Sequence, residues 1–101
     1  METKYKEIFK LRKLLDHILI PYAFLERDDL NGFQIIYPCT DNPICSVIEH
    51  DYSYGADKDL LEIMGLLTEQ EKQEDSVKGY LSANDVFYRI KKHFDEEGVI
   101  Y

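Results

Sequence analysis

Apolar and charged positions alternate with helical spacing over the first twenty residues. Apolar side chains recur there every third or fourth residue, and the lysines fall outside this stripe. This spacing predicts an amphipathic helix over residues 3–19. Pro21 is expected to end it, because proline has no N–H to donate and disfavours helical backbone at the preceding residue.

The following thirty residues change to the period of two that is typical of strands. We expect strands over residues 22–26, 33–37 and 44–50. Asn31-Gly32 lies in the first connection and supplies positive φ at low cost. Because both connections are too short for a crossover, the three strands should form an antiparallel meander.

After Gly55 the spacing of leucine and methionine residues approaches four, which predicts a helix over residues 57–66. Thr68 and Glu71 then form a capping-box pattern, so a short helical turn should follow. Residues 77–81 are compatible with either a short extended piece or a loop.

Ser82 is expected to cap the last helix with Asp85 at its third position, and Gly98 is placed to end it. The basic residues of this helix are explained by its dipole alone; they are Arg89, Lys91, Lys92 and His93. The predicted fold is therefore one α+β domain over residues 1–101. It consists of a three-stranded antiparallel meander covered by an N-terminal helix and two C-terminal helices, in the order α-β-β-β-α-α.

The composition indicates a folded chain and argues against some classes of binding partner. The 101 residues are 45% apolar and 13% aromatic, which is enough for one core and argues against disorder. The net charge of −8 argues against direct binding to nucleic acid or to an anionic membrane. No apolar run approaches the ~18 residues of a membrane span, and the N-terminus has no signal-peptide core, so we expect a cytoplasmic protein.

The negative charge is concentrated in the middle of the chain. Residues 26–75 contain thirteen acids and three bases, a balance of −10, whereas residues 1–20 carry +2. One interpretation is a solvated face that keeps a small domain soluble. The other is an acidic surface, gathered on one side, that docks on a basic partner.

The residues that could carry chemistry do not form a catalytic or metal-binding pattern. Cys39 and Cys45 flank a turn and could pair, but a cytoplasmic location favours free thiols, and two cysteines fall short of a zinc site. Ser46 and His50 share a strand face but lie ~13 Å apart, too far for a hydrogen bond. We therefore predict no enzyme, no catalytic residues, no metal and no cofactor.

The segment from His50 to Gly55 is the strongest candidate for a small-ligand site. As a strand-to-helix corner it would offer backbone N–H groups and several polar side chains. The candidate set is His50, Tyr52, Ser53, Tyr54 and Gly55, with Arg27 or Lys58 as a base for phosphate. The alternative is packing and capping, because the nearby aspartates would repel a phosphate.

Several short segments carry a resemblance to a known group of proteins. They are Cys-Ser-Val-Ile-Glu-His at 45–50, Ser-Tyr-Gly at 53–55, Asp-Leu-Leu-Glu-Ile-Met-Gly-Leu-Leu-Thr at 59–68, Gly-Tyr-Leu at 79–81 and Val-Phe at 86–87. Over residues 44–90 the chain resembles small uncharacterised proteins of phages and prophages in Gram-positive gut bacteria. The resemblance implies synthesis inside an infected or lysogenic bacterium. Small acidic phage proteins are often inhibitors of host defences, which extends the expectation by analogy.

The leading functional hypothesis is a non-enzymatic, anti-CRISPR-like inhibitor that binds a host defence protein. Its acidic surface would occupy a basic nucleic-acid-binding channel. The expected contact residues are Glu62, Glu69, Glu71, Glu74 and Asp75, with Tyr52 and Tyr54 as aromatic anchors. Two alternatives stay open: a sponge for a nucleotide second messenger at residues 50–55, and a phage regulatory or structural module, which could be a homodimer.

Overall fold

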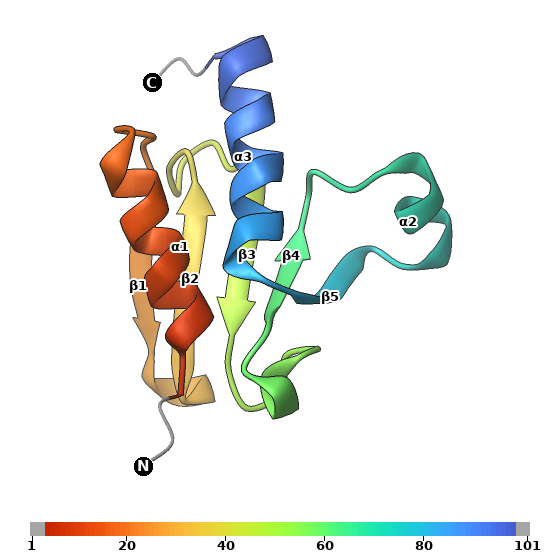
Figure 1. Ribbon diagram of the computed structural model, residues 1–101. Helices are drawn as coiled ribbons and strands as arrows, with labels where there is room; N and C mark the ends of the chain where they lie inside the picture. Colours follow the sequence, from red (N-terminus) through yellow and green to blue (C-terminus); the bar gives the residue numbers. More distant parts are fainter. Residues whose placement is uncertain (1–3, 99–101) are drawn as a thin grey trace.

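A computed structural model describes residues 4–98, which form a five-stranded antiparallel sheet and three α-helices (Figure 1). The strand order is β1-β2-β3-β4-β5, so every strand pairs with its neighbour in sequence. The strands are β1 (Ala23–Arg27), β2 (Gly32–Tyr37), β3 (Cys45–Glu49), β4 (Leu61–Met64) and β5 (Val77–Leu81). The helices are α1 (Lys6–His17), α2 (Glu69–Glu74) and α3 (Ala83–Glu97), with 3₁₀ turns η1 (Asp28–Leu30) and η2 (Ala56–Lys58).

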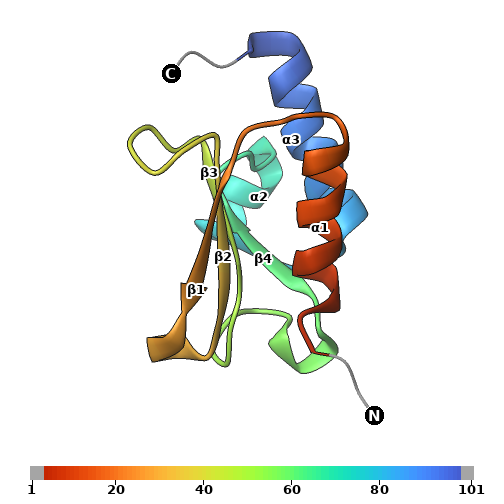
Figure 2. The same ribbon diagram turned by 90° about the vertical axis from the view of Figure 1, so that its left-hand side faces the viewer.

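Helices α1 and α3 pack side by side on one face of the sheet (Figure 2). The core lies between these layers and is built from fully buried side chains of both, such as Leu11, Ile35, Ile63 and Ile90. The opposite face of the sheet has no helix over it within residues 4–98. None of the helices in this range is long and apolar enough to cross a bilayer.

The first half of the chain follows the predicted pattern closely. Helix α1 spans Lys6–His17 and ends before Pro21, while residue 3, where it was expected to begin, lies outside the described residues. The three predicted strands are present within two residues of their expected bounds. The capping boxes Thr68–Glu71 and Ser82–Asp85 are both formed, and Gly98 is the C-cap of α3. The α+β class is therefore confirmed.

The predicted helix over residues 57–66 is wrong. A single 3₁₀ turn is followed by Asp59 at φ 57°, and the chain then extends into β4. Leu61 and Ile63 are fully buried in the core, so the burial period here is two. The apolar residues of this segment fit both periods, and pairing on both sides of β4 decides for the strand.

The meander consequently has five strands rather than three. Residues 77–81, left open between extended chain and loop, form the edge strand β5, which pairs with β4. The short helical turn predicted after Thr68 is present as α2, and it lies within the connection between these two strands (Figure 1). We call this connection, residues 65–76, the α2 arm.

Candidate functional site

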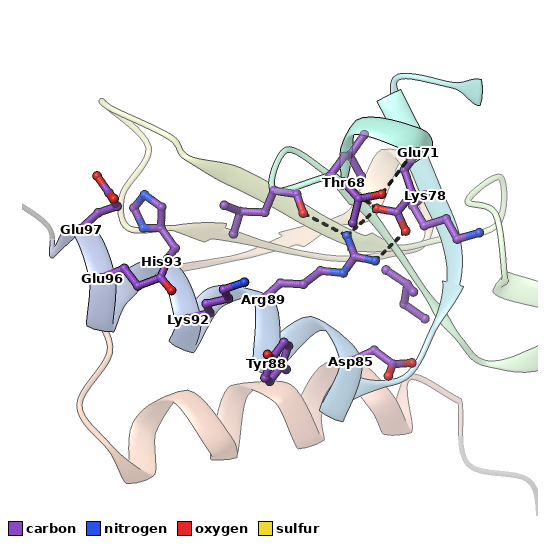
Figure 3. A pocket seen from close by; sticks show the side chains of 13 residues that line it. Thr68, Glu71, Lys78, Asp85, Tyr88, Arg89, Lys92, His93, Glu96 and Glu97 are labelled. Atoms are coloured by element: carbon purple, nitrogen blue, oxygen red, sulfur yellow. Dashed lines mark hydrogen bonds and ion pairs between the residues drawn. The ribbon is translucent and has the colours of Figure 1, made fainter. Parts of the chain in front are cut away.

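A groove of about 970 Å³ lies between the α2 arm, β5 and α3. Leu66, Leu67 and Leu81 give it apolar surface. Its charged side chains come from both walls and are drawn in Figure 3; they are Glu71, Lys78, Asp85, Arg89, Lys92, Glu96 and Glu97, with Thr68, Tyr88 and His93 also lining it. Its size and mixed lining make it the leading candidate for a binding site.

An Arg89–Glu71 ion pair joins the two walls of the groove. Arg89 Nη1 donates to Glu71 Oε1 at 2.8 Å and Nη2 donates to Oε2 at 2.7 Å, a bidentate arrangement. Nη1 also donates to the Leu66 carbonyl at 2.9 Å. The two side chains are only 18% and 16% exposed, and hydrogen bonding to Arg89 lowers the pKa of Glu71 to about 2. This pair therefore holds the α2 arm against α3.

Glu71 has a second role at the start of α2. Its Oε1 accepts the Thr68 N–H at 2.9 Å, while Thr68 Oγ1 accepts the Glu71 N–H at 3.2 Å. The capping box predicted from the sequence is thus confirmed. Glu71 was also predicted to contact a partner, but its carboxylate is already committed to Arg89 and Thr68.

The other acidic residues of the α2 arm face solvent. Glu69, Glu74 and Asp75 are exposed, and Lys72 is the only base of the arm. Lys72 lies 3.4 Å from Glu69, and Asp75 accepts the N–H of Ser76 at 2.6 Å. The outer surface of the arm is therefore strongly acidic.

The remaining predicted contact residues lie at the other end of β4. Glu62 accepts the Tyr54 N–H at 2.8 Å, and the Tyr54 carbonyl accepts the N–H of Tyr80 at 3.3 Å. Gly79 approaches the Tyr54 side chain so closely that a Cβ there would clash. Tyr52 is 79% exposed. The structure thus brings Glu62 and Tyr54 together beside the edge strand, at a distance from the arm acids.

The acidic residues of the middle segment do not share one side of the molecule. Asp28 and Asp29 lie in η1, which connects β1 to β2 at one edge of the sheet, whereas the α2 arm extends from the opposite edge (Figure 1). The expected gathering on a single side is wrong, because the strands β2, β3 and β4 separate the two groups. Glu69, Glu74 and Asp75 therefore form one acidic group, on the α2 arm, and Asp28 and Asp29 belong to another.

The turn from His50 to Gly55 uses its polar groups internally. Ser53 Oγ accepts the His50 N–H at 3.0 Å and donates to the His50 carbonyl at 2.9 Å. His50 Nδ1 accepts the Tyr52 N–H at 3.1 Å. The helix expected to follow this turn is only a three-residue 3₁₀ turn, so the predicted helix dipole is absent. These contacts favour the packing interpretation over a ligand site.

Neither of the two bases assigned to that ligand lines the groove described above. Arg27 lies on the edge strand β1, where it pairs with Asp29 at 3.4 Å and donates to Gln34 at 2.8 Å. Lys58 is exposed in η2.

Two carboxylates each cap a helix start that is far from them in sequence. Asp59 accepts the backbone N–H of Tyr5 at 2.7 Å and that of Lys6 at 3.3 Å, at the start of α1. Glu7 in turn accepts the N–H of Ala83 at 2.8 Å, at the start of α3. These contacts tie η2 to α1 and α1 to α3, and neither could be read from local sequence.

Glu49 lies next to these capping carboxylates and is 2% exposed. Its Oε1 has no hydrogen-bond partner among residues 4–98. Burial, and then hydrogen bonding to the Asp59 carboxyl, raise the pKa of Glu49 to about 9. The group is therefore a neutral carboxylic acid at pH 7. The alternation of Cys45 and Val47 toward the core carried the signal for this burial, since Glu49 continues the same series.

The structure identifies no metal site within the residues it describes, where no group of three or more His, Cys, Asp or Glu side chains has a suitable arrangement. Cys39 and Cys45 are free thiols, and burial raises the pKa of Cys45 to about 12. Comparison with protein-family models, curated proteins and solved structures finds no match. The resemblance to phage proteins therefore stays a prediction.

Proposed function

We propose that this chain is a non-enzymatic binding protein whose α2 arm docks on a basic surface of another protein. The observation that carries the proposal is the arm itself, which presents exposed carboxylates at Glu69, Glu74 and Asp75 beyond the edge of the sheet. The Arg89–Glu71 pair orders the arm before any partner binds. Pre-ordering of this kind lowers the entropic cost of association.

Proteins that bind nucleic acid are the partners that fit this chemistry. Their channels collect lysine and arginine side chains that neutralise phosphates. Exposed carboxylates on a narrow arm could enter such a channel and complement its charge. The anti-CRISPR-like inhibitor predicted from the sequence is one form of this function, with Glu69, Glu74 and Asp75 kept as contact residues. Glu71 becomes a residue that positions the arm.

The test compares two charge-reversal variants with the same change in net charge. E69K/E74K changes the arm, and D28K/D29K changes the η1 turn at the opposite edge of the sheet. Both alter the net charge of −8 by +4. Neither touches Thr68, Glu71 or Arg89, so the arm should keep its position in both variants.

Each protein is used to capture partners from a bacterial lysate, and the captured protein is then measured at 50, 150 and 300 mM NaCl. We expect wild type and D28K/D29K to bind a lysine- and arginine-rich protein, with affinity falling as salt rises. E69K/E74K should bind at least about tenfold more weakly. Equal weakening by both variants would reduce the effect to overall charge and refute the role of the arm. Binding that is indifferent to salt would refute the electrostatic basis.

A further inference from the structure

We propose that the groove behind the α2 arm binds a small amphipathic anion, a molecule with an apolar body and one carboxylate or phosphate group. This site is separate from the proposed docking surface, because the groove faces α3 whereas Glu69 and Glu74 do not line it. The inference therefore does not depend on the acidic arm having a protein partner.

The apolar part of the site is supplied by leucine side chains of both walls. Leu66 and Leu67 come from the chain that leads into α2, and Leu81 from the end of β5. Leu66 and Leu67 pack against the core without being fully buried, so part of their surface faces the groove. A volume of about 970 Å³ is at the upper end of the range for small-molecule sites.

Four carboxylates and three bases line the groove, and two of the carboxylates are already engaged by protein groups. Glu71 is neutralised by Arg89 and hydrogen-bonded to Thr68, and Asp85 accepts the N–H of Ser82 at 3.2 Å as part of its capping box. Figure 3 shows Glu96 and Glu97 at the far end of α3, away from the α2 arm.

Two bases of the groove have no such commitment. Neither Lys78 nor Lys92 lies within ion-pair distance of a carboxylate in the part of the chain that the structure describes. Lys92 follows Arg89 by three residues, so both are on the same face of α3. An anion beside Lys92 would meet an ammonium group that has no ion-pair partner among the described residues.

His93 and Arg89 are held in place before a ligand arrives. His93 Nδ1 is hydrogen-bonded to the buried Tyr37 hydroxyl at 2.8 Å, which fixes the imidazole at one end of the groove. Arg89 is fixed by its three hydrogen bonds to the α2 arm. The walls are thus pre-organised, and an apolar body with one anionic group would leave few polar atoms unpaired.

The experiment uses three probes that separate the two parts of the ligand: octanoate, 1-octanol and acetate. Binding to the full chain is measured by isothermal titration calorimetry at 150 mM NaCl. We expect saturable binding of octanoate, and at least tenfold weaker binding of octanol, which lacks the charge, and of acetate, which lacks the apolar body. Octyl phosphate in place of octanoate shows whether carboxylate or phosphate is preferred.

K92Q and K91Q form the matched pair of variants. Both remove one positive charge from adjacent positions of α3, but Lys91 pairs with Asp95 at 2.5 Å and does not line the groove. K92Q should weaken octanoate binding roughly fivefold, as expected for loss of one charge-assisted contact, while K91Q should change it less than twofold. The proposal is overturned if octanoate does not bind saturably, if octanol binds as tightly, or if the two variants behave alike.

Discussion

Replacing Glu49 with glutamine should stabilise the protein at neutral pH. The side chain is 2% exposed, one of its oxygens has no partner within residues 4–98, and its pKa is raised to about 9 by burial and by Asp59. The unfolded chain releases this proton near the ordinary value of 4.5. Folding at pH 7 therefore requires the carboxyl group to take up a proton, and E49Q removes this requirement while preserving shape.

The size of this stabilisation follows from the pH interval over which Glu49 is protonated in the folded state but ionised in the unfolded state. Between pH 4.5 and 7, each unit contributes about 1.4 kcal/mol. Allowing for solvent that reaches the edge of the cluster, E49Q should raise the free energy of unfolding at pH 7 by roughly 2–3 kcal/mol. For a chain of this length, that corresponds to an increase in Tm of roughly 10–20 °C.

The sign of the pH dependence is specific. A raised pKa means that the stability of the wild type is fully present below pH 4.5 and is lost as pH rises toward 9. Urea unfolding followed by circular dichroism from pH 5 to 9 should show this decline in wild type and a nearly flat profile in E49Q. D59N removes the neighbouring charge and keeps an acceptor for the α1 N–H groups, so the decline should still begin near pH 4.5 but level off at a lower pH and be smaller in total.

E74Q is the matched control, because Glu74 is exposed on the α2 arm and its substitution should change stability by less than about 0.5 kcal/mol. A wild-type stability independent of pH between 5 and 8.5 would refute the reasoning. So would an E49Q variant that is no more stable than wild type at pH 8, because Glu49 would then be ionised in the folded state at little cost.

Two further predictions concern the Arg89–Glu71 ion pair and two of the glycines. Hydrogen bonding to Arg89 lowers the pKa of Glu71 to about 2, so the stabilisation from this ion pair is present above pH 4.5 and is lost as pH falls toward 2. Acid titration of E71Q should show a shallower loss of stability over this interval than that of wild type. An identical slope would contradict a stabilising role for the Arg89–Glu71 ion pair. G32A should prevent folding or cost more than about 3 kcal/mol, because its Cβ would contact the Glu49 carbonyl and lie 2.6 Å from His50 Cα. G98A has nothing within 4 Å of its Cβ but a φ of 68°, so it should cost only about 1 kcal/mol in urea unfolding. Similar costs for the two variants would contradict the close approach of β2 and β3.

Local signals predicted most of the first half of the fold and the caps of the later helices. A capping box needs only residues three positions apart, so Thr68–Glu71 and Ser82–Asp85 could be recognised directly. The long-range partners of Glu71 and Asp59 could not be recognised in this way. Arg89 is 18 residues from Glu71, and Tyr5 is 54 residues from Asp59. The burial of Glu49 was accessible from strand alternation, whereas its contact with Asp59 was not.

The assignment of residues 57–66 decides where the candidate sites lie. As a helix, this segment would cover the three-stranded meander, and the acids of residues 69–75 would lie beside it. As β4, it extends the sheet and pairs with β5, so α2 is displaced beyond the sheet as an arm. The groove then arises between this arm and α3, closed by Arg89 and Glu71. Both proposed surfaces, the acidic outside of the arm and the groove behind it, depend on an element that periodicity alone could not assign.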